Sequence, residues 1–150
     1  MLFVLIFLFI NFQFISTICP NGSFLYQSNC YIFNSTEVGY EEAELTCKNY
    51  GGHLASIHNA FENSALHSAS QNYTGTSFWI GARRYPYEAI PWEWTDRTSW
   101  DFTDWGPYGY INSPVNDCAH MYVTAGDWDA STKYDTLPFV CKVHADRFSL

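Results

Sequence analysis

The sequence predicts one compact domain that combines helices with β-strands. Its 150 residues are enough for one core, and its 47% hydrophobic and 19% aromatic content argues against disorder. Helical periodicity in the first half of the chain gives way to strand-like alternation in the second half. The net charge of −8 opposes binding to nucleic acid and to anionic lipid, so we expect neither as a partner.

The chain begins with an apolar segment, residues 1–10, that is shorter than the roughly 20 residues needed to span a bilayer. Its length suits the core of a signal peptide, although no Lys or Arg accompanies it. We expect residues 1–17 to be a signal peptide whose cleavage leaves a secreted protein with no membrane attachment; a retained signal anchor is the alternative.

Export determines how the five cysteines are interpreted, because thiols pair in an oxidising compartment. Five is an odd number, so at least one cysteine has no partner within the chain. Three acceptor sequences for N-linked glycans, at Asn21, Asn34 and Asn72, agree with export. Polar loops also produce such sequences by chance, so glycosylation at these positions is an expectation.

Two amphipathic helices are predicted in the first half of the chain. Residues 37–48 contain helix formers with apolar side chains at helical spacing, and Ser35 or Thr36 is the predicted cap. The second helix runs from about Asn59, its predicted cap, to Ser68. Its predicted apolar side consists of Phe61, Ala65 and Leu66.

Short strands are predicted from alternating or aromatic-rich segments. A hairpin closed by Cys19 and Cys30 fits the turn-rich sequence between them. The predicted strands are residues 31–33, 53–57, 78–81, 92–96, 118–123 and 137–143.

The segment 97–116 is predicted to be a packed long loop, because it mixes aromatic residues with Gly, Pro, Asp and Ser. Three aspartates in or beside it, Asp96, Asp101 and Asp104, admit two interpretations. They are either solvated loop carboxylates, which we favour, or a metal or acid–base cluster.

A set of motifs in fixed order resembles the C-type lectin-like domain over residues 19 to about 143. The motifs are Cys19-Pro20, Cys30-Tyr31, the run from Cys47 to Ile57, Trp79-Ile80-Gly81, the run from Trp92 to Asp96, Asp117-Cys118, Trp128-Asp129 and the run from Pro138 to Cys141. The resemblance implies an α+β fold with two helices, antiparallel sheets and a long ligand-binding loop. It also implies disulfides Cys19–Cys30 and Cys47–Cys141, a domain at residues 19–143 and a short tail at residues 144–150.

The sequence departs from the family pattern at its fourth expected cysteine. Lys133 stands where the partner of Cys118 would be. We therefore expect Cys118 to be unpaired within the chain, either as a buried inert thiol or as the bridge of a disulfide-linked dimer.

The calcium site by which the family binds sugars is also degenerate in this sequence. Gly109, Tyr110 and Ile111 occupy the slots of the family's acid-proline-amide triplet, and Arg83 and Arg84 stand where acidic ligands of an auxiliary ion would be. Only Asn116 and Asp129 offer oxygens at matching positions. We expect no metal cofactor beyond a weak residual calcium site at these two residues.

The resemblance implies a non-catalytic recognition module whose ligand is a glycan or a protein. The candidate ligand-binding residues are Trp105, Tyr108, Tyr110, Asn116, Trp128 and Asp129. The four aromatic side chains either contact a ligand where exposed or pack the loop. An assembly component, such as a Cys118-linked dimer or a hetero-oligomer subunit, is the alternative, and an enzyme using Asp117, Cys118 and His120 is a remote third.

Overall fold

The computed structural model describes residues 19–73, 75–85, 92–107 and 113–145. The predicted signal peptide lies outside the described residues, as do Tyr108 and Tyr110. Neither helix in the described part of the chain has the length and hydrophobicity that a membrane span requires.

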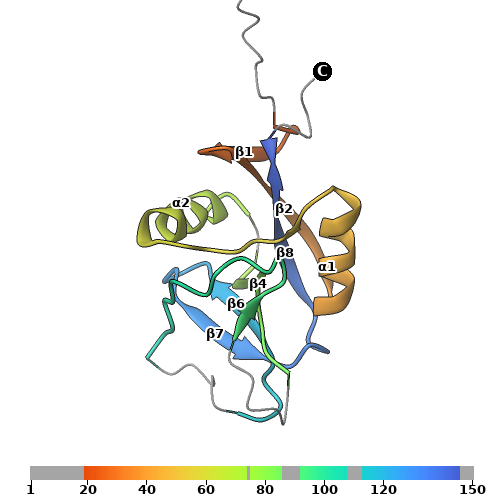
Figure 1. Cartoon of the computed structure of the whole chain (residues 1–150), viewed down its shortest axis with the longest axis vertical. Coiled ribbons are helices and arrows are strands. Elements are labelled where there is room, and N and C mark those ends of the chain that lie inside the picture. The colour runs from red at the N-terminus through yellow and green to blue at the C-terminus, as the bar shows by residue number, and fades with distance from the viewer. Residues whose placement is uncertain (1–18, 74, 86–91, 108–112, 146–150) are drawn as a thin grey trace, which may run out of the picture.

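The described residues form two helices and eight strands (Figure 1). In chain order these are β1 (Ser23–Tyr26), β2 (Asn29–Val38), α1 (Tyr40–Asn49), β3 (His53–Leu54), α2 (Ala60–Ser70), β4 (Ser77–Arg83), β5 (Glu93–Trp94), β6 (Cys118–Tyr122), β7 (Trp128–Ser131) and β8 (Leu137–His144). This arrangement confirms the predicted α+β fold, and β8 runs to His144, one residue past the expected domain boundary at residue 143.

Six strands follow one another across the sheet in the order β1-β2-β8-β4-β6-β7, while β3 pairs with β8 and β5 pairs with β4. All pairings are antiparallel except the one between β4 and β8, where Trp79 lies opposite Phe139. The sequence did not predict β7, because Trp128–Ser131 is too short to show alternation. Figure 1 shows β6 and β7 at the end of the molecule opposite β1.

The helices lie on opposite sides of β2 and β8 (Figure 1). The disulfide between Cys47 and Cys141 joins α1 to β8, and the Cys19–Cys30 disulfide closes the β1–β2 hairpin. Both predicted pairings are therefore confirmed. In the loop-closure model the first restricts the unfolded chain by about 4 to 5 kcal/mol and the second by about 3 kcal/mol.

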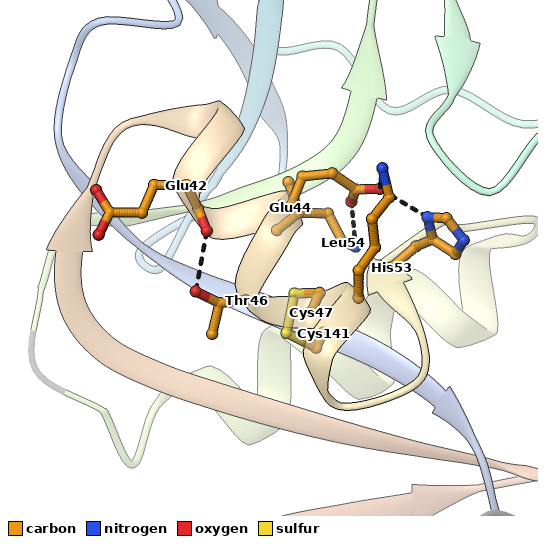
Figure 2. The surroundings of a disulfide bond; sticks show 8 residues. Glu42, Glu44, Thr46, Cys47, His53, Leu54 and Cys141 are labelled. Atoms are coloured by element: carbon orange, nitrogen blue, oxygen red, sulfur yellow. Dashed lines mark hydrogen bonds and ion pairs between the residues drawn. A yellow bond between two sulfur atoms is a disulfide. The ribbon is translucent and has the colours of Figure 1, made fainter.

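A buried carboxylate strengthens the attachment of α1 beside this disulfide. Figure 2 shows Glu44 turned towards the start of β3, where its oxygens accept from the backbone N–H of Leu54 at 2.9 Å and contact Nδ1 of His53 at 2.6 Å. The helix ends at Asn49, one residue after the predicted end, and Gly51 beyond it adopts a positive φ of 85°.

The first predicted helix cap is wrong. Ser35 and Thr36 belong to β2, and α1 begins three residues later than predicted. The residue before it is Gly39, which has no side chain to form a cap. The backbone N–H of Tyr40 donates instead to the carbonyl of Lys133 at 3.1 Å. A tertiary contact thus satisfies a helix terminus that the local sequence leaves open.

The second predicted cap is confirmed, and the predicted apolar face of α2 is right for Leu66 but wrong for Phe61. Asn59 accepts from the backbone N–H of Glu62 at 2.9 Å. Phe61 is 81% exposed, whereas Glu62 and Asn63 are buried with Leu66. The helix therefore faces the core through two polar side chains as well as Leu66, because the polar side chains hydrogen-bond to the strands and to the long loop.

Candidate functional site

An aromatic cluster lies beneath the long loop and holds it to the sheet. Trp94 of β5 and Trp128 of β7 are fully buried at its centre, with ring centroids 5.6 Å apart. Trp100 packs on Trp94 at 4.7 Å, and Phe102 and Trp105 each pack edge-on against Trp128 at 5.7 Å. The predicted packed loop is confirmed for its described residues.

Burial changes the roles of the predicted ligand-binding tryptophans. The Trp128 ring has no exposed surface, and its Nε1 donates to Oδ1 of Asn63 at 2.8 Å, so it cannot present a ring to a ligand. Trp105 is only half-buried, and its ring lies 4.8 Å from that of Trp92. Of the predicted aromatic contacts within the described residues, Trp105 alone retains exposed surface.

The three loop aspartates all bind the segment 56–63, which leads into and begins α2. Asp96 accepts from Ser56 at 2.5 Å, Asp101 contacts Nδ1 of His58 at 2.8 Å and Asp104 accepts from Asn63 at 2.8 Å. The favoured interpretation as solvated carboxylates was incomplete, because each carboxylate anchors the loop. Since their partners are spread along this segment, the three do not form a metal cluster.

The environment of Asp96 keeps its carboxyl ionised. Burial by itself raises the pKa of this carboxyl, but hydrogen bonds from Ser56 and Thr98 oppose it, and the pKa lies below its usual range. The positive charge of Lys142 also lowers the pKa of Asp96, but by less than the hydrogen bonds do. The loop is therefore attached most firmly when Asp96 is charged.

We predict that Asp96→Asn lowers the free energy of unfolding by about 1 to 2 kcal/mol at neutral pH, because hydrogen bonds to a charged acceptor are lost. The pKa of Asp96 is lower in the folded than in the unfolded state, so this stabilisation is present above the unfolded value of about 3.9 and disappears as the pH falls through the folded value. Urea unfolding of both proteins between acid and neutral pH measures the difference.

The control for this prediction is Asp135→Asn, which removes an exposed aspartate outside the long loop. It should change stability little at either pH. A destabilisation by Asp96→Asn that persists unchanged in acid would show that the charge of this residue does not hold the loop.

One side-chain arrangement has the distances of a catalytic triad but lacks its chemistry. His58 lies 2.8 Å from Asp101 through Nδ1 and 3.2 Å from the Ser56 hydroxyl through Nε2. However, Ser56 is fully buried, and its hydroxyl donates to Asp96 at 2.5 Å. The hydroxyl can neither reach a substrate nor pass its proton to the imidazole, so the geometry supports no nucleophilic catalysis.

The two remaining candidate calcium positions, Asn116 and Asp129, already interact with other groups of the chain. Asp129 uses one oxygen to accept from the backbone N–H of Ala130 at 2.7 Å and the other to contact Tyr122 at 3.2 Å. The guanidinium of Arg84 donates to the carbonyl of Asn116 at 3.2 Å and places a positive charge beside it. No group of three or more His, Cys, Asp or Glu side chains in the described ranges could hold a metal ion.

Cys118 is an unpaired, buried thiol in the core beside Tyr40 and Trp79. Burial, together with the neighbouring Asp117 carboxylate, raises the pKa of the Cys118 thiol far above its usual range. The reactive thiolate is therefore disfavoured, and the thiol is shielded from other molecules. This geometry disfavours both a catalytic Cys118 and a Cys118-linked dimer.

Lys133 lies where a disulfide partner of Cys118 would be expected. Its backbone N–H donates to Asp117 at 3.0 Å, and its charge acts on the Cys118 thiol. We predict that Lys133→Cys forms a bond with Cys118 and stabilises the fold by up to about 3 kcal/mol through loop closure. Mass spectrometry measures the bond, and the melting temperature in the presence and absence of reductant measures its effect.

The matched control is Lys133→Ser, which removes the same charge without adding a thiol. A confirmed bond that does not raise the melting temperature above that of the control would show that the geometry here has diverged from that of a disulfide. In the unsubstituted protein, the single thiol should react with alkylating agent only after unfolding.

A polar pocket of about 470 Å³ was not anticipated from the sequence. It lies between the β1–β2 turn, the start of α2, the residues after β5 and the end of β8, and its lining includes Asn29, His53, His58 and Thr98. No sequence signal marks it, because its walls come from separate segments.

Comparison with known proteins agrees with this architecture. The C-type lectin domain family matches residues 36–143. The chain is 30% identical over 138 residues to Rheacalcin-2 of Rhea americana, covering 84% of this chain and 96% of that protein. It is 33% identical to lymphocyte antigen 75 of Homo sapiens over 118 residues, which are 76% of this chain but only 7% of that protein.

The fold is similar to the crystal structure of a calcium-independent type II antifreeze protein, with a TM-score of 0.74 and 27% identity over 85% of this chain and 95% of the other. These matches and the geometry define a C-type lectin-like domain. The chain belongs to the C-type lectin family.

Proposed function

We propose that the protein is a secreted, non-catalytic recognition module that binds a glycan or a protein without calcium. One observation carries this proposal: the long loop is held by tryptophan packing and by three aspartate contacts to residues 56–63. A loop that is already fixed needs no ion to order it.

The ligand-binding surface proposed is the exposed side of the long loop. Trp105 offers a half-exposed ring that is fixed by Trp92 and Trp128, and a fixed aromatic ring loses little entropy when it contacts a ligand. Tyr108, Tyr110 and Asn116 follow in the same loop and stay candidates.

Export is proposed from two sequence features and two disulfide bonds. The apolar residues 1–10, the three glycosylation sequons and the two disulfides all suit the secretory pathway. The weaker candidate function, a Cys118-linked assembly, requires a thiol that the fold keeps buried.

We predict that binding on a glycan array and to extracellular proteins is the same with calcium as with chelator, because no ion completes the site. Trp105→Phe keeps the packing against Trp128 but shrinks the exposed ring, so it should weaken binding severalfold. The control is Tyr134→Phe, which alters a residue that is 79% exposed on the β7–β8 turn. Strong calcium-dependent binding of a monosaccharide would contradict the proposal.

A further inference from the structure

The polar pocket of about 470 Å³ is large enough for a small ligand, because ligand sites usually measure about 300–1,000 Å³. Its walls come from the β1–β2 turn, the start of β3, the start of α2, the residues after β5 and the end of β8. The candidate long-loop contacts that the structure describes, Trp105, Asn116, Trp128 and Asp129, lie outside this lining. The pocket therefore offers a ligand a place that is separate from the exposed side of the long loop.

The single ammonium group in the lining, that of Lys142, has no free donor. Its Nζ donates to Oε1 of Glu62 at 2.7 Å, and to the carbonyl and hydroxyl oxygens of Ser56 at 3.1 and 3.4 Å. These contacts use all three N–H groups of the ammonium. The lining also contains the carboxylates of Glu62 and Asp96, which repel a negative charge. The pocket is therefore unsuited to an anion.

The two carboxylates of the lining are committed as well. Oε1 of Glu62 accepts from the ammonium, and Oε2 accepts from the backbone N–H of His58 at 2.8 Å. On Asp96, Oδ2 accepts from Ser56 at 2.5 Å, and Oδ1 accepts from the backbone N–H and the hydroxyl of Thr98 at 2.9 and 2.6 Å. All four carboxylate oxygens thus have donors within the protein. The pocket is unsuited to a cation too, because a cation would have to compete with these bonds.

The groups that stay available to a ligand are amides and an imidazole nitrogen. Asn59 uses its Oδ1 to cap α2, which leaves its amide nitrogen to donate. Figure 2 shows His53 turned towards Glu44 through Nδ1, so its Nε2 lies on the far side of the ring from that carboxylate. The amides of Gln27 and Asn29, at the β1–β2 turn, each supply a donor and an acceptor. Several donors and acceptors close together match the hydroxyl groups of a sugar.

We propose that this pocket is a second ligand site, which binds an uncharged saccharide through hydrogen bonds to its amide and imidazole groups. The ion pair and hydrogen bonds at its base fix the walls before a ligand arrives, so little ordering accompanies binding. The inference does not depend on ligand binding by the long loop.

The test is saturation-transfer NMR on the full chain with glucose, galactose and mannose, each compared with its amino-sugar and uronate analogues. At least one of the three neutral sugars should bind. Its ammonium and carboxylate analogues should each bind at least about threefold more weakly, because a charged group meets no free partner in the pocket and displaces a hydrogen bond.

The double variant Asn29→Ala/Asn59→Ser tests the location. Serine caps a helix as well as asparagine does, so α2 keeps its cap while the pocket loses two amides. Binding of the neutral sugar should weaken by about five- to tenfold. The matched control is Asn49→Ser, which alters an exposed amide at the end of α1 outside the lining and should leave binding unchanged.

Amide hydrogen exchange of the unsubstituted protein locates the sugar without any substitution. The neutral sugar should slow exchange in residues 52–62, which border the pocket, and leave residues 102–107 of the long loop unaffected. This measurement decides the location even if the double variant is unstable.

Three results would overturn the inference: none of the three neutral sugars binds, a charged analogue binds more tightly than its neutral parent, or Trp105→Phe weakens binding while the double variant does not. The last result would place the sugar on the long loop and support the proposed function. Weakening by the double variant alone supports the pocket and leaves the long-loop proposal to its own test.

Discussion

The packing of Trp128 against Trp94 is the interaction on which the rest of the structure depends. These two fully buried rings join β7 to β5, and the long loop closes over them through Trp100, Phe102 and Trp105. Burying a large aromatic ring contributes several kcal/mol, of order 2 to 3 for each, so the cluster can order an irregular loop by itself. Because the loop is held from below, its upper surface is free to vary in chemistry.

The polar contacts around this cluster support the proposal that the loop needs no calcium ion. Asp96, Asp101 and Asp104 direct their carboxylates towards residues 56–63, while Arg84 places a cation beside Asn116. Carboxylates that accept fixed hydrogen bonds are poor ligands for an ion that needs six to eight oxygens. The domain has the architecture of its family, and these aspartates hold the long loop to residues 56–63.

Much of the fold could be predicted because it is encoded in short-range patterns. Helical spacing located both helices, and the motifs around the four paired cysteines identified the family and its disulfides. The misses share a physical cause: tertiary contacts replaced local preferences. The helix α1 begins at Tyr40 because the carbonyl of Lys133 accepts from the backbone N–H of this residue. The helix α2 buries Glu62 and Asn63 because β8 and the loop supply their partners. The burial of Trp128 and the polar pocket likewise depend on segments that only folding brings together.

The most direct test of the central claim is amide hydrogen exchange across residues 92–107 and 126–131, measured with saturating calcium and with chelator. If tryptophan packing orders the long loop, protection in both segments is the same in the two conditions and falls when Trp128 is replaced by Leu. Protection that appears only with calcium, and that the Trp128→Leu substitution leaves unchanged, would contradict the account.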